Sequence, residues 1–366
     1  MARPSREGPQ KATATRLDPV GLVREVCAIA GNRRYLTQLR EWLADQGVVD
    51  AVAQGKSGPI FEWLCRQFAY QGIANGVAAG HIEVHGSARY ADLEAQFKAG
   101  RATCPKLGSF AGYVGCRFKK HAWTCANPGQ LESCLVPMVP ARKGSLSETA
   151  VSLYLFIRDV ANGDLVGLID RTIGSVDAPR HPDLIARRRL ALLGRLRPIR
   201  GVSDKLLAMT FSDLLVGAGA GRDRWVEVGG SMVAVDTLVH NFLHRTGIIA
   251  RSGRPHPYGP ACYRPGGCAE IVDRIARAID CRQFASSLPP YFPRFVQHSI
   301  WAFCAEGQLG ICNGRTIDDR ERCANTPCPL YVACPRVALR PAPSEPDAAK
   351  TLARASRRSK IRPARR

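Results

Sequence analysis

The hydrophobic and polar positions of this chain mostly repeat with a helical period. Over 60–82, apolar side chains recur every three to four residues, as on the buried face of an amphipathic helix. Similar patterns predict one or two helices over 21–54 and further helices over 146–170, 182–197, 205–217, 269–282 and 292–304. Few segments alternate with the two-residue period of a strand. The sequence therefore predicts a mainly α protein.

Glycine, proline and charge mark the breaks between these patterns. A Gly-rich insert covers 217–231, and a Pro/Gly loop covers 251–268. The first 20 residues are polar, and residues 335–366 are rich in Pro, Ala and Arg. These two ends are expected to be disordered, with the folded part between them.

The charge of the chain points to a polyanionic partner. The 366 residues carry a formal net charge of +21, and 45% of them are hydrophobic, enough to bury a core. Residues 335–366 hold ten Lys and Arg against two acids, a net +8, which leaves +13 for residues 1–334. Nucleic acid is the usual partner of such a surplus, although a basic surface that is only solvated has the same composition.

The 14 cysteines become informative once a compartment is inferred. The first residues lack the apolar region of a signal peptide, and no run of apolar residues is long enough to span a membrane. We therefore expect an intracellular protein. In a reducing compartment, clustered cysteines bind metal more often than they form disulfides.

The stretch "LLGRLRPIRGVSDKLLAMTFSDLLV", 192–216, is predicted to form a helix, a hairpin and a second helix. Gly201 permits a left-handed turn, and exposed amides in such a turn at a helix start bind phosphate. Lys205 falls in the first turn of the second helix. It either contacts phosphate or, beside an acid, supplies the amine for a Schiff base.

A single acid, Asp236, precedes the helical run in "GGSMVAVDTLVHNFLHRTGI", 229–248. Aspartate before a helix is ordinarily an N-cap, held ionised by backbone amides. A carboxylate fixed in this way can also stabilise a cationic transition state or help to deprotonate a nucleophile. Asp236 is thus a plain cap or a cap that also serves catalysis.

Four cysteines gather near the end of the folded region, at Cys312, Cys323, Cys328 and Cys334, separated by 10, 4 and 5 residues. Four thiolates in a short loop suit either a tetrahedral zinc ion or a [4Fe–4S] cluster, and spacing alone does not choose between them or exclude unligated thiols. Cys304 lies in an apolar helix and is expected in the core, although it could replace one ligand.

Two of these motifs together carry a resemblance. "IRGVSDKLLA" followed by "VAVDTLVHNFLHRTGI" resembles the helix-hairpin-helix DNA glycosylases, the superfamily of endonuclease III and the adenine glycosylases. The cysteine loop is similar to their C-terminal [4Fe–4S] loop, and "CPLYVAC" matches its last spacing. Arg200 and Ser203 replace the usual Pro and second Gly, and the segment between Lys205 and Asp236 is longer than usual.

The resemblance covers roughly residues 55–334 and implies two helical domains flanking a DNA-binding cleft. Residues 55–235 would form a helical barrel domain that carries the hairpin, and residues 21–54 would pack with 236–334 in the cysteine-cluster domain. Residues 1–20 and 335–366 would be disordered basic ends. The target nucleotide would flip out of the duplex, because the glycosidic carbon cannot be reached inside the stack.

By the same resemblance, Lys205 and Asp236 are the catalytic residues. Gly201, Val202 and Ser203 would contact DNA through the hairpin, and Gln71, at the end of the first barrel helix, would reach into the duplex. Gln71 is otherwise an ordinary polar residue at a helix end. The four cysteines from Cys312 to Cys334 would hold a [4Fe–4S] cluster, with zinc as the alternative.

The expected function is a DNA glycosylase of base excision repair with AP-lyase activity, acting as a monomer on double-stranded DNA that contains a damaged, mismatched or modified base. A monofunctional glycosylase that uses water activated by Asp236, and a non-catalytic DNA-binding protein, are the two alternatives. The sequence does not identify the base that is excised.

The remaining cysteines have no tight spacing. Cys104, Cys116, Cys125 and Cys134 form a second metal site or are scattered thiols, and scattered thiols fit the spacing better. Cys262 and Cys268 are interpreted in the same way. Between Cys116 and Cys125, "RFKKHAW" mixes cations and aromatics, as a DNA-contacting loop or a solvated basic loop does.

Overall fold

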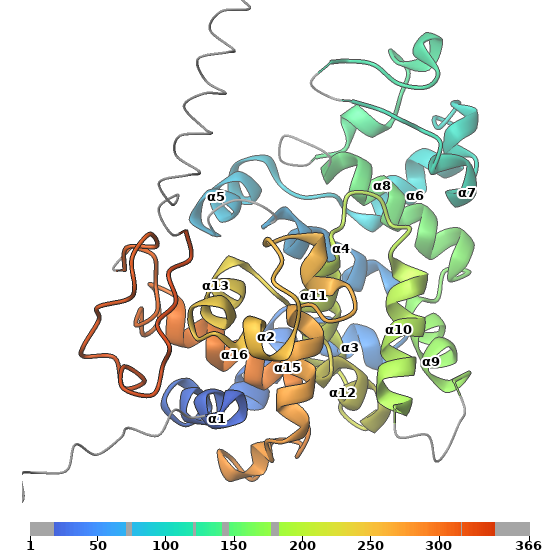
Figure 1. Ribbon diagram of the computed structural model, residues 1–366. Coiled ribbons are helices and arrows are strands. Elements are labelled where there is room, and N and C mark those ends of the chain that lie inside the picture. Colours follow the sequence, from blue (N-terminus) through green and yellow to red (C-terminus); the bar gives the residue numbers. More distant parts are fainter. Residues whose placement is uncertain are drawn as a thin grey trace, which may run out of the picture.

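The computed structural model describes residues 18–70, 75–119, 122–140, 146–176, 183–315 and 317–340. Regular structure in these ranges is helical, and their only β-type pairing is an isolated bridge between Lys119 and Thr124 (Figure 1). The prediction of a mainly α protein is confirmed. None of the helices in these ranges has the length and apolar character needed to cross a bilayer.

Most consecutive helices are joined by fewer than ten residues, but 32 residues separate α7 from α8. The first group is α1 (Pro19–Ala30), α2 (Tyr35–Asp45), α3 (Val48–Ala53), α4 (Ser57–Ala69), α5 (Asn75–His85), α6 (Tyr90–Lys98) and α7 (Phe110–Tyr113). The middle group is α8 (Leu146–Leu155), α9 (Leu165–Gly174), α10 (Leu184–Leu196), α11 (Asp204–Gly217) and α12 (Asp223–Gly230). The last group is α13 (Thr237–Arg245), α14 (Ile248–Ser252), α15 (Cys268–Arg277) and α16 (Pro293–Cys304).

The Gly-rich insert 217–231 differs most from its sequence pattern, because most of it forms helix α12. Trp225 of this helix is buried, and its indole nitrogen donates to the Asp170 carboxylate at 2.6 Å. A Cβ on Gly229 would lie 2.7 Å from Leu215 Cβ, so glycine lets α12 pack closely on α11. The glycines here serve helix packing rather than flexibility.

The buried apolar side chains form two clusters. The first lies among helices α3 to α12, and the second joins α1, α13 to α16 and the C-terminal cysteine loop. Helix α2 contributes to both, with Leu36 in the second cluster and Leu43 in the first. The prediction of two domains around a DNA-binding cleft, in the arrangement of the DNA glycosylases, stays a prediction.

Ion pairs join the helices of the two clusters. Arg294 of α16 donates to Asp213 of α11 at 2.9 Å, and the arginine is 7% exposed. Arg189 of α10 donates to Asp273 of α15, also at 2.9 Å. Breaking a buried pair leaves an uncompensated charge, so these contacts hold the two groups of helices in one orientation.

Residues near both chain ends belong to the folded part. Helix α1 packs on α16 (Figure 1). After the cysteine loop, the Val337 amide donates to the Arg245 carbonyl, and the Leu339 amide donates to the Asp319 carbonyl, both at 2.8 Å. Residues 335–340, expected in the disordered tail, thus pair with the core, whereas 1–17 and 341–366 lie outside the described residues.

Candidate active site and metal centres

The hairpin between α10 and α11 has the turn that the sequence predicted. Gly201 adopts a left-handed conformation with φ of 79°. The amides of Gly201, Val202 and Ser203 donate to no other described residue. Ser203 caps α11, since its hydroxyl accepts from the Leu206 amide at 3.4 Å. Three amides in a row at a helix start form a ready site for an anion such as phosphate.

Arg200, which stands where the glycosylase hairpin usually has proline, anchors this turn. Its amide donates to the Ser152 hydroxyl at 2.9 Å, and its guanidinium pairs with buried Glu148 at 2.9 Å. The same guanidinium donates to the carbonyls of Cys116 and Phe118 at 3.3 Å. The hairpin is therefore fixed to α8 and to the cysteine-containing segment before it.

Asp236 is the N-cap of α13, as predicted. Its backbone is extended, and its Oδ1 accepts from the Val239 amide at 2.9 Å. The residue is partly exposed, and it forms no ion pair within the described residues. One carboxylate oxygen is thus fixed by the helix, and the other has no partner there.

A cavity of about 370 Å³ lies between the start of α11 and the segment that leads to Asp236. Asp204 of α11 lines one side, and Met232 and Val233 line another. Its basic lining residues are Arg189, Arg197 and Arg264. Lys205 follows Asp204 directly, is partly exposed and pairs with no described acid. Asp204, directly before Lys205, and the segment four and three residues before Asp236 thus share one cavity, whereas Lys205 and Asp236 are not among its lining residues.

Two tyrosines lie beside the segment that carries Asp236. The Tyr263 hydroxyl accepts from the Val235 amide at 2.8 Å and donates to the Val235 carbonyl at 3.3 Å. Burial raises the pKa of Tyr263 far above its usual range. Burial also raises the pKa of Tyr258, and the nearby Asp236 carboxylate raises it further. Both phenols therefore stay protonated beside the aspartate and remain able to donate hydrogen bonds.

The predicted metal ligands Cys312, Cys323, Cys328 and Cys334 all line one small cavity, between α13, α16 and the C-terminal loop. Sulfurs on one tetrahedral zinc ion lie about 3.8 Å apart, given a Zn–S bond of about 2.3 Å. No three of these four sulfurs lie within 4.8 Å of one another. In the described ranges, one other group of possible ligands is that compact, and it is described below. Their spacing is wider than one zinc ion requires. Cys304 does not line this cavity and is fully buried, as expected of a core residue.

Arg245 of α13 also lines the four-cysteine cavity and is 2% exposed. It donates through one nitrogen to Asp319 at 2.6 Å, and its guanidinium also lies near the Cys312 thiol. Its Nε and Nη1 form no hydrogen bond of normal geometry with the described residues. The Arg336 amide donates to the Cys334 sulfur at 3.3 Å. A buried cation with two unpaired nitrogens is costly unless an anion lies beside it, so the cavity suits an anionic group.

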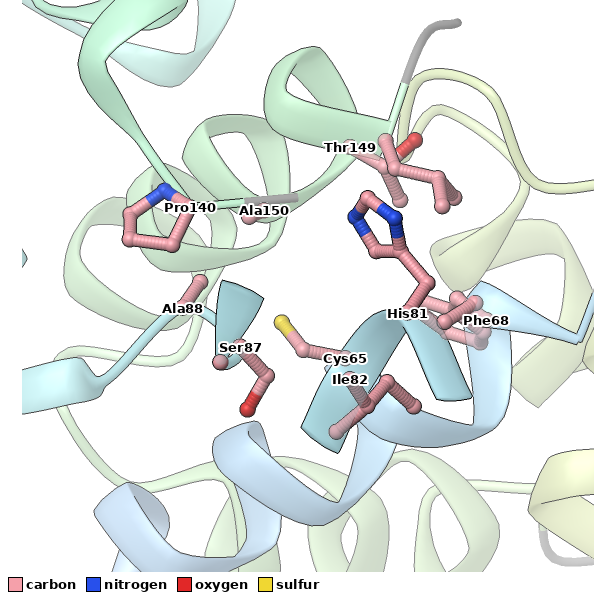
Figure 2. Close-up of a pocket in the computed structure, with 12 residues that line it drawn as sticks. Cys65, Phe68, His81, Ile82, Ser87, Ala88, Pro140, Thr149 and Ala150 are labelled. Carbon is pink, nitrogen blue, oxygen red and sulfur yellow. The ribbon is translucent and has the colours of Figure 1, made fainter. Parts of the chain in front are cut away.

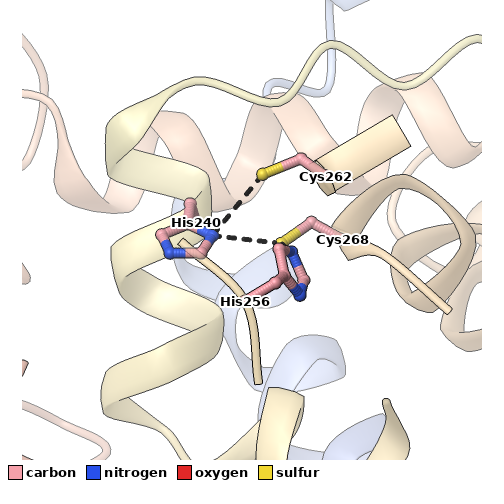
Figure 3. A group of neighbouring side chains, drawn as sticks. All are labelled: His240, His256, Cys262 and Cys268. Atoms are coloured by element: carbon pink, nitrogen blue, oxygen red, sulfur yellow. Dashed lines mark hydrogen bonds between the residues drawn. The ribbon is translucent and has the colours of Figure 1, made fainter. Parts of the chain in front are cut away.

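A second group of candidate ligands starts one helical turn after Asp236, and it joins Cys262 and Cys268 with two histidines that the sequence pattern does not single out. It consists of His240, His256, Cys262 and Cys268, whose ligand atoms all lie within 4.8 Å of one another (Figure 3). The His240 Nδ1 is 3.3 Å from the Cys268 sulfur and 3.6 Å from the Cys262 sulfur, and the His256 Nε2 is 3.3 Å from the Cys268 sulfur. This cluster could hold a metal ion.

The signal for this cluster in the sequence is weak. Its members are separated by 15, 5 and 5 residues, without the close Cys-x-x-Cys pair that marks most zinc sites. His240 also sits on an apolar helix, where histidine is commonly a core residue. The stronger clue was that the Pro/Gly loop 251–268 contains two cysteines and one histidine within 13 positions.

Other predicted residues lie apart from these sites. Gln71 falls outside the described residues. The sulfurs of Cys104, Cys116, Cys125 and Cys134 interact electrostatically, so they lie in one region, but no three of them come within 4.8 Å.

A cavity of about 20 Å³ between α4, α5 and α8, beside Cys65 and His81, has room for about one water molecule (Figure 2).

Comparisons with known proteins return no relative: no family model, curated protein or solved structure matches the chain. The resemblance to the DNA glycosylases therefore rests on the quoted motifs, and any function must be argued from the residues described above.

Proposed function

We propose that the chain is a DNA glycosylase in which Asp236 and Lys205 act on one flipped nucleotide. The observation that carries the proposal is the shared cavity. The residue before Lys205 and the segment that leads to Asp236 line it together, although 30 positions separate the two residues in the chain. The hairpin amides of Gly201, Val202 and Ser203, which could hold the DNA backbone, lie just before α11, the helix that carries Lys205.

Asp236 would stabilise the positive charge that develops on the deoxyribose as the glycosidic bond breaks. The helix holds one of its oxygens, so the carboxylate needs little reorganisation when the charge appears. A fixed carboxylate of this kind serves either a water nucleophile or an amine. Asp236 is therefore expected to be needed for base release in either case.

Lys205 would be the nucleophile. Its unprotonated Nζ would attack C1′, the bond from C1′ to the base would break, and the base would leave with the bonding electrons and take up a proton. Loss of one proton from the attached amine and opening of the sugar ring, with O4′ taking up a proton, would give an iminium ion, and β-elimination would then remove a C2′ proton and expel the 3′ phosphate. The absence of a described acid that pairs with Lys205 leaves its side chain available for this role.

The four C-terminal cysteines would bind a [4Fe–4S] cluster. Three observations support this: the shared cavity, the wide sulfur spacing, and the unpaired nitrogens of Arg245, which an anionic cluster would neutralise. The bound cluster would cross-link the irregular loop that follows α16. Arg245 belongs to α13, so the loop and the helix that Asp236 caps would be held together.

The partner would be double-stranded DNA. A charge of +13 on residues 1–334 favours a polyanion, and the three hairpin amides, which have no partner among the described residues, offer one defined phosphate contact. Phosphate contacts position the duplex, whereas the cavity between α11 and the Asp236 segment would select the base. A panel of duplexes that each contain one altered base would identify the base that is excised.

The test is a panel of duplexes, each with one oxidised, mismatched or modified base, incubated with the purified protein with and without borohydride. We expect base release and strand nicking on at least one duplex, and a covalent adduct under borohydride. Lys205→Arg keeps the positive charge but should abolish the adduct. Base release without an adduct would point to the monofunctional mechanism, and tight binding without release on every duplex would contradict the glycosylase proposal.

A further inference from the structure

We propose that His240, His256, Cys262 and Cys268 bind one structural zinc ion, which clamps the loop 253–268 against helix α13 and thereby fixes the segment before Asp236. This site is separate from the four-cysteine cavity. It does not depend on the proposed glycosylase activity, because zinc binding and loop mobility can be measured without a substrate.

The geometry fits a single tetrahedral ion. With a Zn–S bond of about 2.3 Å and a Zn–N bond of about 2.0 Å, a nitrogen and a sulfur on the same zinc lie about 3.5 Å apart. The three nitrogen–sulfur distances here are 3.3, 3.6 and 3.3 Å. In a [2Fe–2S] centre with two histidine and two cysteine ligands, the histidines bind one iron atom and the cysteines bind the other. The distances between histidine and cysteine ligand atoms are then too long for a group whose ligand atoms all lie within 4.8 Å of one another.

The ring of His256 is oriented to act as a ligand. His256 Nδ1 lies 2.7 Å from the Arg254 carbonyl, which can only accept, so Nδ1 carries the proton. The opposite nitrogen, Nε2, then has a free lone pair and points to the Cys268 sulfur (Figure 3). Such a hydrogen bond from the second ring nitrogen is the usual support of a metal-bound histidine.

Four protein ligands fill the coordination of zinc, so the site is closed and structural rather than catalytic. Cys262 and Cys268 are fully buried, and His240 is 6% exposed. The backbone is packed tightly around them, because a Cβ on Gly267 would lie 2.4 Å from the Ala261 carbonyl oxygen and 2.7 Å from that of Cys262. Zinc would neutralise two thiolates that burial otherwise disfavours.

Two sets of contacts connect the proposed zinc site to Asp236. His240 lies one helical turn after Asp236 on α13, and its ring is 5.9 Å from that of Tyr258. Tyr263, next to Cys262, bonds both the amide and the carbonyl of Val235, the residue before Asp236. The Tyr263 side chain of the loop thus satisfies both backbone groups of Val235. A metal ion that holds the loop in place would therefore also position Asp236.

The test compares metal contents of the full-length chain and its variants. We expect about one zinc per chain, lost in Cys262→Ala. Cys281→Ala is the matched control, because Cys281 is also fully buried but lies outside the cluster. Cys323→Ala should lose iron and keep zinc. Equal zinc in Cys262→Ala and Cys281→Ala, or folded wild-type protein that binds neither zinc nor cobalt, would overturn the site.

A milder variant covers the case in which Cys262→Ala does not fold. His256 is partly exposed, so His256→Gln should fold with three ligands and lose zinc to a chelator at least about tenfold faster, since even the loss of a residue that hydrogen-bonds a ligand weakens metal binding by that factor. An unchanged release rate would exclude His256 as a ligand.

Hydrogen exchange tests the positioning role. Removing zinc should speed the exchange of amides in 253–268 and of Val235, whereas α8 should not change. Exchange that is unaltered in 253–268 after zinc removal would overturn the clamp, even if zinc binds. Neither result bears on base excision, so failure here is distinguishable from failure of the glycosylase proposal.

Discussion

The carboxylate of Asp236 accepts a hydrogen bond from the Val239 amide at 2.9 Å, so one of its oxygens caps helix α13. A residue with this geometry can serve the helix and the chemistry at once. The two roles differ in what they need, since the cap needs an acceptor oxygen and the chemistry needs a charge.

Asp236→Asn should separate the two roles. Asparagine is an equally good N-cap, so the free energy of unfolding should change by less than about 0.5 kcal/mol, while base release should fall by about a hundredfold or more. Urea unfolding and single-turnover excision measure the two effects. Asp18→Asn, the same change at the N-cap of α1, is the control and should leave excision intact. Normal excision by Asp236→Asn would make the residue a cap only.

The C-terminal cavity should contain iron and sulfide. Protein purified without oxygen should be brown and hold about four iron atoms per chain. Cys323→Ala should lose them, whereas Cys281→Ala should keep them, because Cys281 is fully buried but does not line the cavity. Two zinc ions per chain and no iron would show that this cavity also holds zinc.

Arg245→Met should lower cluster retention without removing a ligand. The methionine is close in length but lacks the charge that would balance an anionic cluster. We expect iron to be lost faster in air than from wild type, by about tenfold, as visible absorbance would show. Arg251→Met, on the next helix and outside the cavity, is the control. Equal rates for the two variants would contradict an electrostatic role of Arg245.

DNA binding should weaken steeply with salt. If about six phosphates are contacted, raising salt from about 50 to 200 mM should lower the affinity about a thousandfold. Truncation after Arg340 removes eight basic and two acidic residues and keeps the hydrogen bonds to Asp319. It should reduce the salt slope but leave excision intact. A flat salt dependence would contradict the interpretation of the charge.

The stability of the fold should fall in mild acid because of His298. Burial, with the nearby Arg294 guanidinium, lowers the pKa of His298 from 6.5 to about 4. The neutral ring is therefore favoured in the folded state. Its contribution is present above about pH 6.5 and is lost as the pH falls towards 4, by up to roughly 3 kcal/mol.

Urea unfolding at pH 7.5 and at pH 5 tests this. His298→Gln should reduce the loss of stability between the two values, whereas His85→Gln, at an exposed position, should not. An identical loss in both variants would show that other groups dominate the acid sensitivity.

Much of the helical architecture follows from periodicity, because each helix buries one stripe of apolar side chains. The helix starts at Asp204 and Thr237 were also predictable, since Ser203 and Asp236 are good N-caps. Helix α12 was not, because its glycines are chosen for close packing on α11, and packing is not visible in a local pattern.

The sites were predictable only where their residues are close in sequence. The four cysteines from Cys312 to Cys334 lie within one loop, so their spacing in the sequence is enough to predict them as metal ligands together. His240 and Cys268 lie 28 positions apart and meet only because α13 and the start of α15 are neighbours in space. The role of Arg200 depends likewise on distant partners in α8. Contacts of long sequence separation are set by the tertiary fold.

The pairing of α1 with α16 has a consequence for synthesis on the ribosome. Leu22, Val23 and Val26 of α1 are buried in the cluster to which α16 belongs. Helix α1 therefore cannot complete its packing until the roughly 270 residues that follow it, up to the end of α16, have been made. At about 5 to 20 residues per second, its apolar face waits some tens of seconds for its partner. During that interval a nascent chain of this protein would be a natural client for chaperones.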